Sequence, residues 1–394
     1  MSSAQTYVGL RVLDLSTNIA GPYAALILAD LGADVIKIER SPAGDDTRAL
    51  PPRWGDEATV FLAMNRNKRS VLLDIKLPAG RDAILSLAKT ADVVIESFPP
   101  GVAEKLGLMP AAFAAANPAI VTCTVSAFGD GPLGSTMPGY DALVQAVSGL
   151  MSLTGHPGSD PIRTGPSILD VSTGLWSVIA IQAALARRAA GAGGTHVQAS
   201  LIESAFSLVV HQVQGFLATG EQPPKLGSGA PSAAPYRVYR TNDGHVMIAT
   251  ASEPQFPRLC AALGLESLAT DTRYKVMAAR LANRETLDSA IEETTVRYDT
   301  ADLLAILAAA GISAGRVHDL ASALASPIAQ ELNLFVEGST VGQPHALPMQ
   351  RTPIDPDGDG MRRPPPRLGE HTSEVLAELN RPTKPTNEEQ DNVG

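Results

Sequence analysis

Cysteine is nearly absent from this sequence, which has 394 residues and only two cysteines. Cys123 and Cys260 lie far apart and within apolar runs. That placement is typical of reduced core residues rather than of a disulfide or a metal-binding pair. The seven histidines are scattered without a metal-ligand spacing such as HExxH, so we expect no metal site.

Long runs of one character are also missing. No Lys/Arg run is longer than a pair such as Lys68-Arg69, and the formal net charge of −10 argues against nucleic acid or an anionic membrane as a partner. The chain opens without a basic segment followed by an apolar one, and no apolar run approaches the roughly 20 residues that cross a bilayer. We therefore expect a soluble, cytoplasmic protein that is not exported. Any anionic ligand must be held by local positive charge.

The apolar content is high enough for a large core. Hydrophobic residues make up 44% and charged residues 18% of the chain, which excludes wholesale disorder. A chain of this length usually exceeds one compact core. A large domain and a smaller one are therefore expected.

The first half of the chain alternates short apolar strands with helices. The pattern predicts strands over residues 11–16, 34–39, 70–75, 92–98 and 119–128, and helices over 21–33 and 79–91. Such alternation predicts an α/β fold with a mostly parallel sheet covered on both faces. Further on, it predicts helices over 139–151, 171–190 and 204–219, and a strand over 195–202.

Residues 220–235 interrupt this pattern with a Gly/Pro/Ser-rich segment that is typical of a connector or a mobile active-site loop. A hairpin is predicted next, over 236–250, with Asn242, Asp243 and Gly244 in its turn. The remaining predictions are helices over 253–263, 282–297, 300–310 and 319–332, a docking helix at the end of 362–379, and disorder from 381 onward. This gives a large domain over 1–220, a small α+β domain with its linker over 221–330, and a return to the large domain over 331–394.

One carboxylate, Asp170, lies at the start of an otherwise apolar helix in the segment PIRTGPSILDVSTGLWSVIAIQAAL, residues 161–185. Asp is a preferred helix-capping residue, so the cap is one interpretation of this charge. On this stretch alone it is the simpler one.

Several cations lie next to the predicted strands. Lys37 and Arg40 end the second strand, Lys68 and Arg69 precede the third, and Lys76 follows it. Doubly wound sheets bind nucleotides at their strand ends, which makes these residues candidates for phosphate contacts. Solvated surface charge is the alternative interpretation.

Six stretches carry a resemblance to a known family. They are VLDLSTNIAGPYAALILADLGADVIKIERSPAGDDTR, MNRNKRSVLLDIK, ADVVIESFPPGVAEKLGL, GYDALVQAVSGLMSLTG, GPSILDVSTG and GISAGRVHDL. Together, from about residue 8 to residue 380, they closely resemble the family III coenzyme A transferases (the CaiB/BaiF family). This group includes formyl-CoA and carnitine CoA transferases, with the α-methylacyl-CoA racemases as a branch.

The resemblance implies a fold, a chemistry and a set of site residues. The implied fold is a Rossmann-like large domain plus a small domain, in a homodimer of interlocked subunits. Asp170 falls on the position of the nucleophile, which forms a mixed anhydride and then an aspartyl-CoA thioester while CoA passes from an acyl-CoA to a free carboxylic acid. CoA is thus a substrate, and no tightly bound cofactor is implied. The positions implied for CoA binding are Arg40, Leu73, Lys76, Ser97, Lys105 and Tyr140, with Arg40 and Lys76 foremost.

Departures from the family pattern bear on the substrate. Formyl-CoA transferase has a His and a Gln where this chain has Thr17 and Ile19, which argues against oxalate or formate and leans towards a larger or less polar acyl group. Lys105 stands where that enzyme has an Arg, which weakens a bidentate phosphate contact. Residues 220–235 match in place a glycine-rich segment that closes over the intermediates in some transferases.

The racemase branch is the alternative function. Its reaction needs two acid/base groups across the α carbon, and Asp170 and Glu253 match two of its positions. Tyr140 replaces the His that serves as a base there, and an unperturbed Tyr, with a pKa near roughly 10, is a poor base at neutral pH. A missing base removes the reaction, so the transferase is preferred. A non-catalytic acyl-CoA binder is a third hypothesis, against which the presence of Asp170 counts.

Overall fold

The computed structural model describes residues 6–336, 338, 347–354 and 361–379. The chain forms two compact units, which are described separately. The first comprises the described residues of Met1–Leu150, Thr164–Leu217 and Leu334–Gly394, and the second comprises Met151–Arg163 and Ala218–Asn333. Residues 151–163 thus belong with the second unit, whereas the sequence did not separate them from the large domain.

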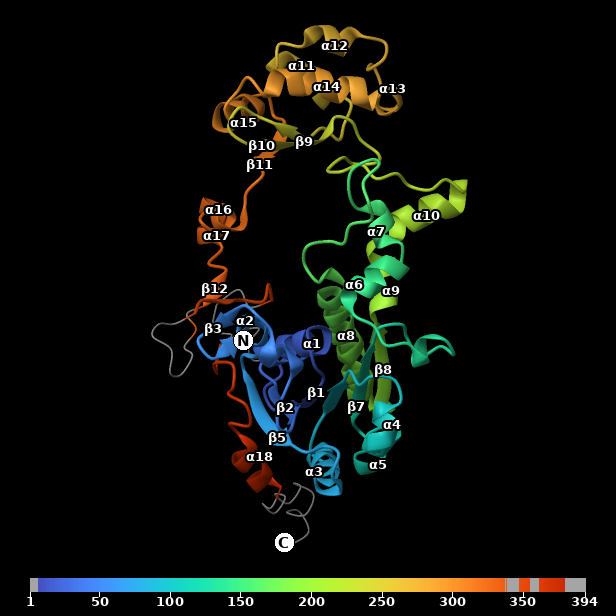
Figure 1. Cartoon of the computed structure of the whole chain (residues 1–394), viewed down its shortest axis with the longest axis vertical. Coiled ribbons are helices and arrows are strands. Elements are labelled where there is room, and N and C mark those ends of the chain that lie inside the picture. Colours follow the sequence, from blue (N-terminus) through green and yellow to red (C-terminus); the bar gives the residue numbers. More distant parts are fainter. Residues whose placement is uncertain (1–5, 337, 339–346, 355–360, 380–394) are drawn as a thin grey trace. The chain divides into compact units, whose positions relative to one another are not determined.

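A six-stranded sheet forms the centre of the first unit (Figure 1). Its strands are β1 (Arg11–Leu15), β2 (Asp34–Arg40), β5 (Lys68–Leu73), β6 (Val93–Glu96), β7 (Val121–Ser126) and β8 (Thr195–Ser200). They lie in the order β5-β2-β1-β6-β7-β8, and all neighbours pair in parallel. This is the Rossmann strand order, which reverses between β1 and β6 and opens a crevice at their carboxyl ends. The predicted α/β class and parallel sheet are confirmed.

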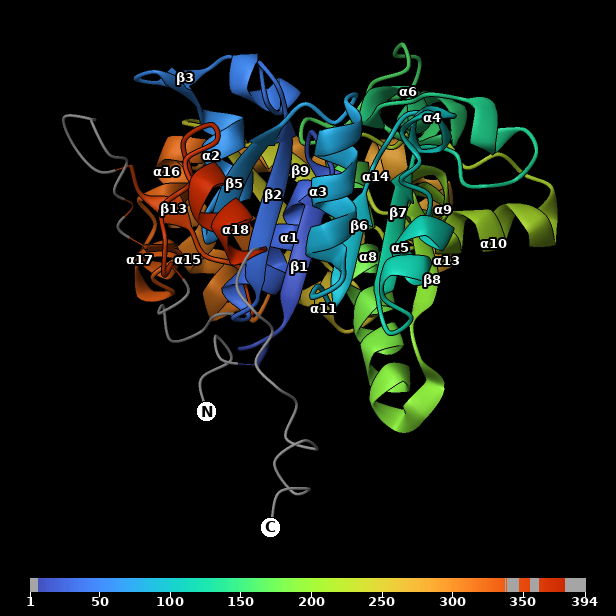
Figure 2. The same cartoon turned by 90° about the horizontal axis from the view of Figure 1, so that it is seen from below.

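Helices cover both faces of this sheet, as Figure 2 shows for the face that carries α3 and α5. On the opposite face, α1 (Ala20–Asp30) packs against α8 (Ile168–Arg187) over a core that includes Val12, Val93 and the buried, free Cys123. The two helices approach closely at Gly174, where a Cβ atom would lie 2.8 Å from the Ala20 carbonyl oxygen. The α3 face is closed by α3 (Pro78–Ala88), α5 (Pro110–Ala116) and α18 (Thr372–Glu378).

The other elements of the first unit are mostly short. They are η2 (Asp46–Ala49), β3 (Arg53–Trp54), β4 (Glu57–Ala58), α2 (Thr59–Asn65), α4 (Val102–Leu106), η3 (Gly134–Thr136), α6 (Asp141–Val147), the π-helical turn η4 (Arg188–Ala192), α9 (Leu201–Leu208), α10 (Val210–Thr219), β12 (Phe335–Val336) and β13 (Met349–Gln350). The predicted helix over 204–219 is therefore two helices, bent by 70°. The predicted helix over 139–151 ends at Val147, and α7 (Leu150–Leu153) follows it across the unit boundary.

One helix corrects the statement that no apolar run nears membrane-spanning length. Within the described part of the chain, residues 168–192 form a helix that is long and apolar enough to span a bilayer, and the bent pair of α9 and α10 passes the same test jointly. Core helices meet this criterion as well, and Leu169, Val178 and Ile181 of α8 are buried inside the first unit. Length and composition therefore do not establish a membrane span here.

The second unit holds a three-stranded antiparallel sheet in the order β11-β10-β9. Its elements are β9 (Tyr236–Arg240), β10 (His245–Ala249), α11 (Gln255–Ala262), α12 (Glu266–Thr270), α13 (Met277–Ala282), α14 (Arg284–Thr295), α15 (Thr300–Ala309), β11 (Ser313–Arg316), α16 (Leu320–Leu324) and α17 (Pro327–Glu331). The predicted hairpin is confirmed, while the helix expected over 319–332 is two short helices. Cys260 is free and buried in this unit's core.

The end of the chain returns to the first unit. Asn67 N–H donates to the Arg363 carbonyl at 3.0 Å, and His371 N–H donates to the Ser70 carbonyl at 2.9 Å. α18 then packs beside β5, where Val375 is buried. The disorder predicted from residue 381 lies outside the described residues.

Candidate active site

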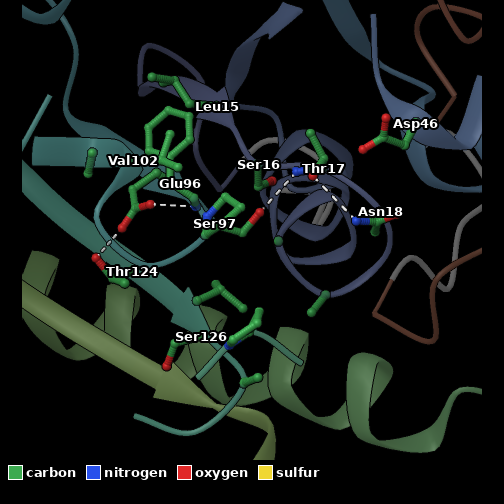
Figure 3. Close-up of a pocket in the computed structure, with 18 of the residues that line it drawn as sticks. Leu15, Ser16, Thr17, Asn18, Asp46, Glu96, Ser97, Val102, Thr124 and Ser126 are labelled. Carbon is green, nitrogen blue, oxygen red and sulfur yellow. Dashed lines mark hydrogen bonds between the residues drawn. The ribbon is translucent and has the colours of Figure 1, made fainter. Parts of the chain in front are cut away.

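A cavity of about 980 Å³ lies in the first unit where the strand order reverses. Its lining comes from the β1–α1 loop, the end of β2 with the following turn, the β6–α4 loop, the segment after β7, and the start of α8. Figure 3 shows the part around the β1–α1 loop, where Thr17 and Ser97 face each other across the reversal point. Thr17 N–H donates to Ser97 Oγ at 3.0 Å. The cavity therefore occupies the crevice in which open α/β sheets bind ligands.

Two of the candidate cations line this cavity and are accessible. Arg40, at the end of β2, is 49% exposed and pairs with Asp46. Lys76 follows β5 and is exposed, with its backbone N–H donated to Asp74 Oδ1. Both side chains can reach an anion in the cavity. Arg40 would do so by leaving its ion pair with Asp46.

The other three candidate cations are not available to an anion. Lys37 and Lys68 are buried and pair with Asp14, at 3.7 and 2.8 Å from its Oδ2. Arg69 is buried beside Asp34 and Glu378, at 2.6 Å from each. The interpretation of these residues as phosphate contacts is wrong, because carboxylates of the fold already occupy their donors.

The remaining residues implied for CoA binding divide into two groups. Ser97 and Tyr140 line the cavity, and Tyr140 is 73% exposed just before α6. Leu73 and Lys105 are not among the lining residues. Leu73 is partly buried against the core of the α3 face, and Lys105 is exposed on α4. The structure thus brings Arg40, Lys76, Ser97, Tyr140 and Asp170 to one cavity and leaves these two outside its wall.

Asp170 lies in the first turn of α8 and lines the cavity. The free N–H groups of that turn are accepted by another carboxylate: Asp141 Oδ2 lies 2.8 Å from Leu169 N and 3.2 Å from Asp170 N. Asp141 is in turn held by Gln145 Nε2, which donates to its Oδ1 at 2.5 Å. The capping interpretation of Asp170 is therefore wrong, because Asp141 does the capping.

The environment of Asp170 disfavours its charged form. Burial, with a contribution from the negative charge of Asp141, raises the pKa of Asp170 to about 7. The free N–H groups at the start of α8 do not stabilise the Asp170 carboxylate, since they donate to Asp141. Among the described residues, neither a hydrogen bond nor an ion pair engages the Asp170 carboxyl. Asp170 is therefore a carboxyl group in a cavity with a pKa near neutral pH, which is typical of a catalytic group.

Glu253, the second acid/base group of the racemase alternative, is part of the second unit's structure. Its Oε1 accepts from Met277 N at 2.7 Å, and its Oε2 pairs at 2.9 Å with the fully buried Arg280. The Met277 N–H and the Arg280 guanidinium lower its pKa. A carboxylate so committed is a support for α13 and a weak base.

Residues 225–235 of the expected mobile loop are anchored within the second unit. Lys225 Nζ donates to the carbonyls of Ser159 and Asp160 at 2.8 and 2.7 Å. Arg284 donates to the Ala230 carbonyl at 2.6 Å, and Arg280 to the Ala234 carbonyl at 2.8 Å. These contacts favour a fixed connector over a freely moving flap.

Asp141 is the site residue that sequence reasoning missed. Its signal was an Asp directly after Tyr140, at the start of a predicted helix. That position predicts a cap for its own helix, α6. The structure shows that the carboxyl reaches α8 instead, across 29 residues of sequence. Local pattern does not reveal such a long-range contact.

Comparisons with known proteins identify the family of this chain. Residues 7–372 match CoA-transferase family III. The succinate–glutarate CoA-transferase of Agrobacterium fabrum is 37% identical over 384 residues, covering 94% of this chain and 95% of that protein. Human succinyl-CoA:glutarate CoA-transferase is 34% identical over 383 residues, covering 96% and 87% respectively. A crystal structure of a CaiB/BaiF family protein from Brucella suis matches with a TM-score of 0.84 at 38% identity, covering 94% of this chain and 98% of that one. The chain is therefore an enzyme of CoA-transferase family III.

Proposed function

We propose that this enzyme moves coenzyme A from an acyl-CoA donor to a free carboxylic acid, with Asp170 as the nucleophile. The observation that carries the proposal is that Asp170 lines the same cavity as Arg40 and Lys76 while its helix-capping role is filled by Asp141. A carboxyl released from a structural task is available to react. The accessible cations supply what a polyanion requires from a protein with a net charge of −10.

The proposed chemistry begins with the ionised Asp170. Its carboxylate oxygen attacks the thioester carbonyl of the donor, the C–S bond breaks, and a mixed anhydride and CoA thiolate result. The thiolate attacks the Asp170 carbonyl of the anhydride, which frees the donor acid and leaves an aspartyl-CoA thioester. The acceptor carboxylate attacks the carbonyl of that thioester, its C–S bond breaks, and a second anhydride and CoA thiolate result. The thiolate then attacks the acceptor's acyl carbonyl, releasing the new acyl-CoA and regenerating Asp170.

Binding of CoA is assigned to the rim of the cavity. Arg40 and Lys76, the two exposed cations that form this rim, bind its phosphates, and Ser97 and Tyr140 line the same cavity as Asp170. Leu73 and Lys105 lie outside the wall, so they contribute only if CoA extends over the rim. Charge-assisted contacts of this kind are among the stronger hydrogen bonds in proteins.

The acids exchanged are proposed to be short dicarboxylic acids. The two relatives described above are named for succinate and glutarate. Ile19 lines the cavity and presents an apolar surface to the acyl part, which suits the methylene chain of such acids.

A panel of acyl-CoA donors incubated with free acids, followed by mass spectrometry of the CoA products, tests the function. New acyl-CoA species should form only when donor, acceptor and enzyme are all present. Hydrolysis to free CoA without transfer would contradict the proposal. The racemase alternative is not favoured, because Glu253 is committed to Arg280 and Met277. Deuterium oxide in the same assay should leave the α carbon of a 2-methylacyl-CoA unlabelled.

The homodimer belongs to this proposal as well. Large apolar side chains of the first unit stay exposed on α6, α8, α9 and α10, namely Leu143, Val147, Leu175, Trp176, Ile179, Phe206, Val210, Phe216 and Leu217. Apolar surface of this extent marks protein contacts in soluble proteins. A second copy of the chain, interlocked as the family resemblance implies, would cover it. Sedimentation should then give about twice 41.1 kDa.

A further inference from the structure

The β1–α1 loop, residues 16–19, lines the same cavity as Arg40, Lys76 and Asp170. It leads into α1, whose first carbonyl, that of Ala20, packs against Gly174 one turn after Asp170. Asn18 in this loop has a φ of 66°, in the left-handed region, which asparagine adopts more readily than other non-glycine residues. The contacts of the loop show what holds this conformation.

Several of its backbone polar groups bond to side chains of β1, β2 and the segments that follow β2 and β6. Ser16 N–H donates to Asp14 Oδ1 at 3.1 Å, and the Ser16 carbonyl accepts from Lys37 Nζ at 2.9 Å. Asn18 N–H donates to Asp45 Oδ1 at 3.3 Å. The Thr17–Ser97 bond completes the set. Three of the four loop residues, Ser16, Thr17 and Asn18, are thus held by side chains.

Lys37 is the centre of this arrangement. Besides the Ser16 carbonyl, its Nζ contacts Asp45 Oδ2 at 2.8 Å and Asp14 Oδ2 at 3.7 Å, and the side chain is 1% exposed. Burial acts to lower its pKa, but the charges of Asp14 and Asp45 outweigh burial and raise it. One buried ammonium therefore joins both carboxylates that hold the loop, and holds the loop itself.

Stability alone is a poor reason for such a cluster. Moving charges out of water costs free energy that their attraction barely recovers, and apolar residues often do as well. What apolar residues cannot do is donate to the Ser16 carbonyl or balance the two carboxylates that hold the loop at either end. The arrangement fixes a backbone conformation next to a reactive carboxyl.

We propose that Lys37 is a positioning residue: it holds the β1–α1 loop so that a thioester bound at the rim reaches Asp170 in a reactive geometry. The inference rests on the proposed nucleophilic role of Asp170. It predicts that Lys37 governs turnover, whereas Arg40 and Lys76 govern CoA affinity. Displacing reacting groups by as little as about 1 Å costs up to about 100-fold in rate.

The test compares Lys37→Met with Arg66→Met. Arg66 forms a buried ion pair with Asp30 at 2.5 Å and does not line the cavity, so it controls for the general cost of deleting a buried cation. For folded Lys37→Met, kcat should fall about 10- to 100-fold while the dissociation constant of free CoA stays within about threefold. Trapping of acylated Asp170 by hydroxylamine should slow by the same factor. Arg66→Met should lose stability yet keep kcat.

Two results would overturn the inference. One is an unchanged kcat in folded Lys37→Met, and the other is a parallel loss of kcat and CoA binding that also occurs in Arg66→Met. If Lys37→Met does not fold, Asp45→Asn replaces it. This variant keeps an oxygen for Asn18 N–H but removes the charge that faces Lys37, so it should again lower kcat without lowering CoA affinity. Failure of the proposed function would give a different result. The wild-type enzyme itself would then show no CoA transfer, and hydroxylamine would trap no adduct at Asp170.

Discussion

The charged residues around the cavity are held in two opposite ways. At the rim, Arg40 and Lys76 are exposed, and the partner of Arg40 is an equally exposed Asp46. At the β1–α1 loop, Asp14, Lys37 and Asp45 are buried, and the Lys37 ammonium lies within ion-pair distance of both carboxylates. Exposed charges exchange partners at little cost, whereas buried ones hold a single arrangement. Arg40 and Lys76 are therefore suited to capturing a polyanion. The buried cluster of Asp14, Lys37 and Asp45 is suited to fixing the β1–α1 loop.

Asp170 differs from both groups, because it is a half-buried carboxyl that forms no ion pair with a cation of the described residues. Its pKa of about 7 means that ionisation costs free energy in the folded state. The same feature makes the carboxylate reactive once it is formed in the right place. The stability of the rest of the fold offsets this cost of ionising Asp170.

The largest effect is expected from Asp170→Asn. Removing the nucleophile should lower the transfer rate by about 10³-fold or more, while CoA still binds to the rim. Mass spectrometry should detect a hydroxylamine adduct at Asp170 in the wild type and none in the variant. Full activity of the variant would remove Asp170 from the mechanism and leave the cavity with a binding role only.

The same substitution also tests stability. The folded-state pKa of Asp170 lies above its ordinary value of 3.8, so the stabilisation that this group provides is complete below pH of about 4 and is lost as the pH rises through 7. Asn does not ionise. At pH 8, Asp170→Asn should therefore be more stable than the wild type, by on the order of 2 kcal/mol after solvent screening. The difference should vanish at low pH in denaturant titrations.

Asp141→Asn should change the pH dependence of the reaction. Attack needs ionised Asp170, so the wild-type kcat should rise with pH and be half-maximal near 7. Removing the charge of Asp141 lowers the pKa of Asp170, although burial keeps it above its ordinary value. The pH at which kcat is half-maximal should consequently decrease. The decrease should be smaller than the full rise of the Asp170 pKa from 3.8 to about 7, because burial remains.

Asp130→Asn is the control for that change, since Asp130 is an exposed carboxyl that lines the same cavity. It should leave the pH profile in place. Equal shifts in both variants would mean that the general negative potential of the cavity, and not Asp141, sets the pKa of Asp170.

Arg40→Ala should weaken CoA binding while sparing kcat. Loss of one charge-assisted contact to phosphate corresponds to an increase in KM of about tenfold, and the remaining affinity should depend less on salt. Lys89→Ala, at an exposed site outside the cavity, serves as the control. An Arg40→Ala enzyme with unchanged KM at low ionic strength would place the phosphates elsewhere.

The sequence predicts the sheet better than it predicts the charges. The β1–α1–β2 unit followed from hydrophobic period alone, because short apolar runs and helical spacing are local properties. Whether the Lys37 side chain is buried or exposed could not be predicted from the sequence. It lies in DVIKIER, a strand buried on both faces, where no alternation distinguishes a surface cation from a buried one.

Contacts between distant segments account for the other differences. Gly227 N–H donates to the Gly155 carbonyl at 2.8 Å, and Lys225 reaches Ser159, which joins 151–163 to the second unit. Asp141 likewise acts on a helix that begins 27 residues further along. The family resemblance pointed to Asp170, but its partner became visible only when α6 and α8 were brought together.

The smallest effect is expected from Asp46→Asn. It should lower the KM for acyl-CoA, whereas Arg40→Ala should raise it. Asp46 occupies Arg40 at the rim and faces the cavity, as Figure 3 shows, so an incoming phosphate must compete with it. Exposed ion pairs contribute about 0.2–1 kcal/mol, which corresponds to a KM for acyl-CoA lowered by about 1.4- to 5-fold. In an Arg40→Ala background the same change should have no such effect, which makes the double-mutant cycle its own control. A lower KM in both backgrounds would mean that Asp46 acts only through its general repulsion of the polyanion, and a higher KM would show that Asp46 holds Arg40 in its binding position.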